Sequence, residues 1–285
     1  MKKKILLSFL KLIVLISAYM IEVMLISGIL IALGLHFPEL KVSQQVSFIQ
    51  LILSGLIGSV FAVYLVSKYS MSRLAVFLVM SFILFFSNIS VAIEGSIFTP
   101  DYVTSSVLLS LFVQQLFIAI AFSFTIILLF RKKLIESSAE LVTNIHKSLA
   151  VKTLVGAAVY MISYYVWGWL NYNLFTHSFY ESGVSGLHIP EGAVLIKIIL
   201  FRGVFVTLSV VPFLLKATPD NKRKLFETGS ILFLFGGIIP MIYTIGMLPG
   251  ALIWYSLIEI FLQNFISGIL IYKIFMYRQG AVTAD

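Results

Sequence analysis

Apolar residues fill most of the chain in long runs, and short polar segments separate each run from the next. A helix that crosses the hydrocarbon core of a bilayer needs about 20 consecutive, mainly apolar residues. The runs predict eight such helices, at residues 12–35, 47–67, 74–95, 105–130, 153–175, 192–215, 228–247 and 250–274. The expected fold is therefore an all-α integral membrane protein, a polytopic bundle of about eight transmembrane helices.

Composition agrees with this pattern and limits the domain organisation. Hydrophobic residues make up 60% of the 285 residues and charged residues only 11%, whereas soluble domains carry roughly 25% charged residues. Almost the whole chain is used in spans, so residues 1–285 are expected to form a single transmembrane domain. Possible halves at 1–130 and 153–285 are joined by residues 131–152, whose apolar positions recur at helical spacing and predict an amphipathic cytoplasmic linker. A weak local similarity between residues 94–99 and 171–176 leaves a parallel duplication of the halves open.

Basic residues predict the orientation of the bundle. All of the 20 Lys and Arg residues except Lys41, Lys197 and Arg202 lie at the N-terminus, at the C-terminus, or near the connections after the even-numbered spans. Cytoplasmic connections are enriched in these residues, so both termini are expected in the cytoplasm and the protein in the cell membrane. The net charge of +8 marks topology and not a nucleic-acid surface, so nucleic acid is not expected as a partner. Membrane lipids are expected partners.

Several ionisable residues interrupt the apolar runs near the middle of the bilayer. Counting about 1.5 Å of rise per residue places one polar layer across four spans, with Gln263 one helical turn from Glu259. This layer is the predicted substrate site, which consists of Glu22, Gln114, Gln115, Arg202, Glu259 and Gln263.

A charge at this depth costs at least about 2.5 kcal/mol and needs a partner. We expect Arg202 to pair with Glu22 or Glu259, which leaves one acid that low dielectric favours in its protonated form. Glu259 is preferred for that role, because Tyr255 and Gln263 lie on the same helical stripe. The alternative is a buried network that only fixes the register of the helices.

A second polar group is predicted near the outer surface, with Glu94, Lys197 and Asn171 as its members. Lys197 lies within reach of Glu94 if both sit at the outer boundary of the bilayer. His177 and His188 occur in the adjoining connection, but their spacing matches no helical metal motif. No metal site and no cofactor are expected, and the absence of cysteine excludes disulfides and thiolate ligands.

The sequence leaves three functions open. The first is transport of a small molecule, ion or lipid through the polar layer. The second is an enzyme that modifies a lipid or lipid-linked substrate at the outer face, using Glu94, Lys197 and one of the histidines. The third is an assembly or sensor subunit whose charges only specify packing. No catalytic signature such as a nucleophile elbow or a phosphate-binding loop is present, and the oligomeric state is left open.

Overall fold

A computed structural model of the chain describes residues 2–38, 42–134, 146–187, 189–216 and 221–276. In these ranges eight helical segments are long and apolar enough to cross a membrane. Their bounds are α1 Lys2–Ala32, α2 Gln44–Lys68, α3 Arg73–Phe98, α4 Ser105–Phe130, α5 His146–Asn171, α7 Gly192–Lys216, the segment α8 Asn221–Phe233, η3 Leu234–Ile238 and α9 Ile239–Thr244, and α10 Gly250–Met276. The predicted all-α membrane fold is confirmed.

The helices begin where the sequence supplies hydrogen-bond acceptors. The hydroxyls of Ser43, Ser72 and Thr104 accept the backbone N–H of the third residue of α2, α3 and α4 respectively. Such caps satisfy one of the backbone donors that a helix start leaves unpaired. The polar segments between the apolar runs therefore also define the ends of the spans.

Two spans contain π-helical turns that the hydrophobic pattern does not predict in detail. The fifth span continues from α5 through η1 (Tyr172–Thr176) and α6 (His177–Glu181), so it ends six residues beyond the predicted limit of residue 175. The seventh span changes to π-helix at η3, which ends two residues before Pro240. Pro240 lacks a backbone N–H, and π-turns are common where a helix adjusts to such a residue or to a functional site.

The connection between α9 and α10 is a tight turn, as the Gly and Pro residues there predict. Gly246 takes a left-handed backbone conformation with φ 84°, and Pro249 precedes the first residue of α10. α10 packs along α8 and η3. Spans seven and eight are therefore neighbours.

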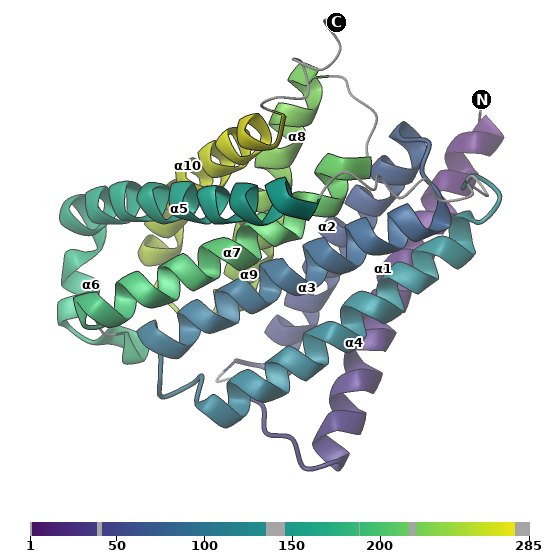
Figure 1. Ribbon diagram of the computed structural model, residues 1–285. Coiled ribbons are helices and arrows are strands. Elements are labelled where there is room, and N and C mark those ends of the chain that lie inside the picture. The colour runs from purple at the N-terminus through teal and green to yellow at the C-terminus, as the bar shows by residue number, and fades with distance from the viewer. Residues whose placement is uncertain (1, 39–41, 135–145, 188, 217–220, 277–285) are drawn as a thin grey trace, which may run out of the picture.

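The two halves of the chain have matching sets of helix neighbours. In the first half (α1–α4), α1 packs against α2 and α4, and α3 packs against α4. In the second half (α5–α10), α5 packs against α7 and α10, and α8 packs against α10. The halves join through α3 on α7 and α2 on α9, and Figure 1 shows α3 and α7 side by side at the centre. This pattern matches α3 with the seventh span and not with the fifth, so the weak similarity between residues 94–99 and 171–176 does not follow it.

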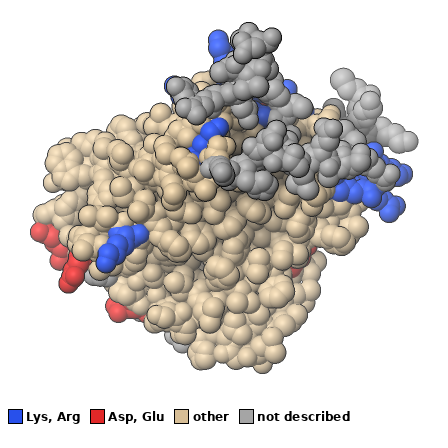
Figure 2. All heavy atoms as spheres, in the orientation of Figure 1, with Lys and Arg blue, Asp and Glu red and all other residues tan. Residues whose placement is uncertain are grey.

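Charged side chains lie mainly at the two ends of the bundle. Figure 2 shows a broad belt without charges across the visible face, with most Lys and Arg at the end where the N-terminus lies and Asp and Glu at the other end. Many large apolar side chains are exposed on the helices, among them Leu25, Leu109 and Trp254, as expected of a lipid-facing surface. We call the end at which α1 finishes the outer end, after the orientation that the basic residues predict. Half of the predicted amphipathic linker, residues 135–145, lies outside the described residues, and the helix α5 already begins at His146.

Candidate functional site

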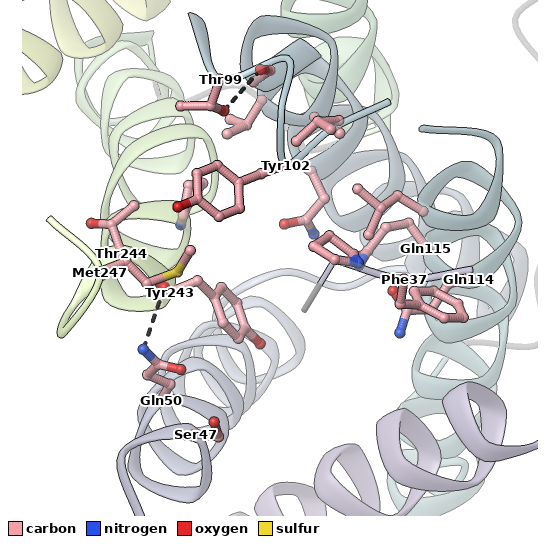
Figure 3. A pocket seen from close by; sticks show the side chains of 18 of the residues that line it. Phe37, Ser47, Gln50, Thr99, Tyr102, Gln114, Gln115, Tyr243, Thr244 and Met247 are labelled. Carbon is pink, nitrogen blue, oxygen red and sulfur yellow. Dashed lines mark hydrogen bonds between the residues drawn. The ribbon is translucent and has the colours of Figure 1, made fainter. Parts of the chain in front are cut away.

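A cavity of about 690 Å³ lies towards the outer end, mainly among the helices of the first half, and α9 and outer connections of the second half close one side of it. Its walls come from α1, α2, α3, α4 and α9, and the connections at the outer end form its rim. Figure 3 shows the side chains of Gln50, Tyr102, Gln114, Gln115 and Tyr243 around this space. The cavity is partly open, and most of its lining is apolar.

Helical periodicity explains which side chains reach the cavity. On α1 the lining residues recur every four positions, and α3 and α4 likewise present one stripe each. The polar side chains on these stripes, with Gln50 on α2, are mainly amides and hydroxyls. The polar lining residues of the four helices include Tyr19, Ser27, Ser47, Gln50, Asn88, Thr99, Gln114 and Gln115.

Hydrogen bonds hold these amides in defined positions. Gln114 Nε2 donates to Ser27 Oγ at 2.7 Å, which links α4 to α1. Gln50 Nε2 donates to the carbonyls of Tyr243 at 3.3 Å and Ile245 at 2.8 Å, which links α2 to the end of α9. Asn88 Nδ2 donates to its own helix at Leu84 O, 2.7 Å away. The cavity therefore has ordered polar points on otherwise apolar walls.

The structure separates the predicted polar layer into two groups. Gln114 and Gln115 line the cavity. Glu22 lies on α1, outside the cavity lining. Its Oε1 accepts a hydrogen bond from Thr125 Oγ1 on α4 at 2.6 Å. Glu22 Oε2 is buried and has no hydrogen-bond partner within the part of the chain that the structure describes.

The other group forms a charged cluster where the second half meets α3, which we define by Glu94, Tyr164, Asn171, Arg202 and Glu259. Arg202 Nη1 lies 2.5 Å from Glu94 Oε1, and Tyr164 Oη donates to the same oxygen at 2.8 Å. The Arg202 side chain is only 4% exposed. This ion pair joins α7 to α3 and therefore joins the two halves.

Aromatic rings and amides complete the surroundings of Arg202. Its guanidinium carbon lies 5.4 Å from the ring centre of Tyr160 and 5.5 Å from that of Tyr164, within the range of cation–π attraction. Gln263 Nε2 donates to Tyr160 Oη at 2.7 Å. The predicted site residue Gln263 therefore supports the aromatic wall of the charged cluster.

Glu259 reaches the charged cluster from α10. Its Oε2 accepts a hydrogen bond from Asn171 Nδ2 at 2.6 Å. Gly168 on α5 makes room for this carboxyl, because a Cβ at that position would lie 3.2 Å from Glu259 Oε1. Asn171 itself is 8% exposed, so the contact is shielded from the surroundings.

Both predicted ion pairs are wrong in their partners. Arg202 pairs with Glu94 and not with Glu22 or Glu259. Glu94 was expected to meet Lys197, but Lys197 is exposed, and no contact within the described residues joins the two. The physical reason is that α3 packs against α7, and that the long Arg side chain extends its charge well away from its own backbone. The predicted outer and midplane sites therefore merge, without Lys197 and without Glu22.

Helix α3 forms the wall between the cavity and the charged cluster. Asn88, Ala92, Gly95 and Thr99 face the cavity, whereas Glu94 points to Arg202 on α7. One helix thus carries polar groups on two faces, and a shift of α3 would affect both sites.

An inner cluster lies away from the cavity, where α2 ends and α8 begins. We define it by Tyr64, Tyr69, Arg223 and Glu227. The hydroxyls of Tyr64 and Tyr69 donate to the two oxygens of Glu227, and Arg223 Nε donates to Glu227 Oε1 at 2.9 Å. Burial, and after it the hydrogen bond to Glu227, raises the pKa of the Tyr69 hydroxyl, which therefore remains a donor. Between this cluster and the cavity, the rings of Phe61 and Phe235 meet edge to face at 5.1 Å.

Sequence reasoning missed the inner cluster and the amides Gln50 and Asn88. An available signal was the spacing of Arg223 and Glu227, which places the two side chains on one helical face. Gln50 and Asn88 are polar residues in apolar spans, which mark a polar interior in the same way as the glutamines of α4. The tyrosines gave no comparable signal, because their contribution depends on α2 lying beside α8.

The residues expected to support an outer enzyme lie apart. His177 Nε2 lies 3.2 Å from Glu181 Oε1 one turn away, and both side chains are at least half exposed. His188 lies outside the described residues. In the searched part of the chain no group of three or more His, Cys, Asp or Glu side chains is placed to hold a metal ion.

The fold and the cavity define the chain as a polytopic membrane protein with eight helices able to span a bilayer. Comparison with models of known protein families, with curated sequences and with solved structures finds no match.

Proposed function

We propose that the protein is a transporter in the cell membrane, with both termini in the cytoplasm, and that it moves an uncharged small molecule or lipid through the cavity. The observation that carries this proposal is the cavity of about 690 Å³ whose lining includes no Asp, Glu, Lys, Arg or His among the described residues. Binding sites for small molecules typically measure 300 to 1,000 Å³ and combine apolar walls with a few fixed polar groups. The amides of Gln50, Asn88, Gln114 and Gln115 provide donors and acceptors for such a ligand without attracting an ion.

The chemistry of the lining favours translocation over catalysis. General acid–base catalysis needs a side chain that exchanges protons near the operating pH. Among the described residues of the lining, the tyrosines are the only titratable side chains, and a tyrosine ordinarily titrates near pH 10. The cavity is therefore suited to hold and release a ligand unchanged.

The packing below the cavity supports one state of an alternating-access cycle. Such a cycle opens a central site first to one side of the membrane and then to the other. The cavity is rimmed by connections of the outer end, while the Phe61–Phe235 contact and the inner cluster join α2 to η3 and α8 towards the inner end. Opening of the inner end requires that α2 and α8 separate, which breaks the bonds to Glu227.

A test of this proposal can use the absence of native cysteine. Asn88→Cys introduces one thiol at the lining position of α3 that lies nearest the inner end, and it removes only a hydrogen bond within the same helix. A membrane-impermeant thiol reagent is added to the outside of vesicles. If the protein is a transporter, the reagent reacts with this residue both in right-side-out vesicles, which expose the outer end of the bundle, and in inside-out vesicles, which expose the inner end. Reaction from one side only would contradict transport and favour a receptor, sensor or assembly role.

Glu227→Gln sharpens the same test. The amide keeps the shape of the side chain but loses the charge that binds Arg223 and the two tyrosines, and hydrogen bonds to charged groups are worth about 1.5–3 kcal/mol. We expect at least a tenfold faster reaction of Asn88→Cys from the inner side in the Glu227→Gln background, because 1.4 kcal/mol corresponds to a factor of ten in an equilibrium constant. An unchanged inner rate would show that the inner cluster does not control access.

A further inference from the structure

The charged cluster contains one more acid than base. Arg202 contributes one guanidinium, and its contact at 2.5 Å is with Glu94. Glu94 also accepts the hydroxyl of Tyr164 at 2.8 Å. Glu259 is left with the neutral amide of Asn171 as its hydrogen-bond donor, at 2.6 Å. If both carboxyls were ionised, the cluster would carry a net negative charge inside the membrane.

Such a charge is unfavourable at this position. Glu259 is itself half-buried, whereas Arg202 and Asn171 beside it are 4% and 8% exposed, and its carboxyl lies against Gly168 without room for a Cβ there. An uncompensated ion in a buried site costs several kcal/mol even after relaxation. A proton on Glu259 removes this cost, because Glu94 and Arg202 then balance each other.

Other groups near Glu259 do not supply a second cation. Helix α5 contributes tyrosines and Asn171, α7 contributes Arg202, and α3 contributes Glu94. The π-turn η3, which also packs on α10, has the sequence Leu-Phe-Gly-Gly-Ile and contains no titratable side chain. Within the described chain, the charged and titratable side chains that face Glu259 are Glu94, Tyr160, Tyr164, Tyr180 and Arg202.

Arg202 also retains an unused donor. Its Nε is buried and has no hydrogen-bond partner among the described residues. When Glu259 loses its proton, its negative charge is attracted to this guanidinium. The carboxylate then turns towards Arg202 and competes with Glu94. Because Glu94 belongs to α3, which also lines the cavity, a change of partner at Arg202 acts on the wall of the cavity.

The corresponding position in the first half has no acid. Glu259 is the tenth residue of α10 and Gln114 is the tenth residue of α4, and these two helices occupy matching places among their neighbours. Gln114 borders the cavity, whereas Glu259 borders Arg202. At these matching positions the second half carries a carboxyl that can exchange a proton, and the first half carries an amide that cannot.

We propose that Glu259 is a proton-binding site and that its proton is the coupling ion of transport. The coupling part rests on the proposed function, whereas proton binding does not. The carboxylate of Glu259 takes up one proton when the cluster closes on Asn171, and it releases the proton when the carboxylate turns to Arg202. Proton binding and the position of α3 are therefore linked.

Infrared spectroscopy of the full chain in lipid nanodiscs tests proton binding without a ligand. We expect an absorption of a protonated carboxyl at neutral pH that disappears as the pH is raised. Glu259→Gln loses the absorption equivalent to one carboxyl per chain, whereas the control Glu22→Gln retains this component. An undiminished titrating absorption in folded Glu259→Gln would overturn the proposal.

Glu94→Gln keeps the test decisive if Glu259→Gln fails to fold. In this variant Arg202 has lost its anionic partner, so Glu259 ionises and pairs with the guanidinium. The same titrating absorption is therefore expected to disappear at neutral pH, although Glu259 is still present. If the absorption persists in Glu94→Gln, the proposed exchange of partners at Arg202 is wrong.

The outcomes also separate this inference from the proposed function. Loss of the absorption in Glu259→Gln, together with reaction of Asn88→Cys from one side only, supports the proton site and contradicts transport. Reaction from both sides with an unchanged absorption supports transport without this proton site. If both tests succeed, Glu259→Gln is expected to leave the inner-side reaction of Asn88→Cys with only the effect of pH that ionisation of its own thiol causes.

Discussion

The two halves of the bundle contain polar residues in matching places but use them in opposite ways. In the first half, amides surround a cavity that the described charged side chains do not enter. In the second half, Arg202 and Glu259, together with Glu94 from α3 of the first half, contact tyrosines and amides in a closely packed interior. In each half a long polar side chain on the second span contacts the other half. Gln50 on α2 binds the end of α9, and Arg202 on α7 binds α3.

This difference follows from what an amide and an ion each require to be stable inside a membrane. An amide next to open space keeps part of its hydrogen bonding with water or a ligand and carries no net charge. An ion at the same depth requires a counter-ion and hydrogen bonds to stay in place. The ion pair and Glu259 therefore lie in a closely packed region where α3 meets the second half, and the space for a ligand lies where the lining is uncharged.

The largest expected effect comes from removal of the base of the charged cluster. Arg202→Met leaves Glu94 without its partner, and the loss of one member of a buried ion pair typically costs about 3–5 kcal/mol. We expect the largest fall in thermal stability among the substitutions discussed, measured by unfolding in detergent or lipid. The double variant Arg202→Met with Glu94→Gln should recover much of the loss, because no uncompensated ion remains at that pair. If the double variant is no more stable than Arg202→Met, the ion pair does not explain the effect.

A smaller effect is expected from two glycines that differ in their surroundings. A Cβ at Gly203 on α7 would lie 2.6 Å from Ala157 O on α5, whereas a Cβ at Gly28 on α1 meets nothing within 4 Å. Gly203→Ala should destabilise the protein by about 1–3 kcal/mol through overpacking. The matched variant Gly28→Ala should be neutral or stabilise by up to about 1 kcal/mol, because Ala favours the helix. Equal stability of the two variants would show that the second half is not packed more tightly at this contact.

Hydrophobic runs were sufficient to predict the spans, and they were less informative about the site. The predicted limits 105–130 coincide with α4, because Thr104 and Arg131 bound an apolar run that contains no charged residue. The fifth span extends to Glu181 because a π-turn carries the helix past Asn171, which a count of apolar residues does not reveal. Span length is a local property, so one sequence predicts it well.

Partners across the bundle depend on which helices are neighbours, and one sequence does not supply this information. Depth counting placed Glu22 and Arg202 at one level, but their helices α1 and α7 belong to different halves. Glu94 was assigned to the outer surface because it lies near the end of its span. The contact between α3 and α7, together with the reach of the Arg side chain, brings it to Arg202. Depth along a helix is therefore predictable, whereas direction around the helix requires the packing.

Thiol accessibility at two glutamines tests the contrast between the halves most directly. Gln115 lines the cavity, and Gln263 is 2% exposed and supports the tyrosine beside Arg202. In the cysteine-free chain, Gln115→Cys should react rapidly with an impermeant reagent from the outer side, and Gln263→Cys should be protected until the protein is unfolded. Equal reaction of the two positions, or protection of Gln115→Cys, would contradict an accessible cavity in the first half beside a closed charged cluster in the second.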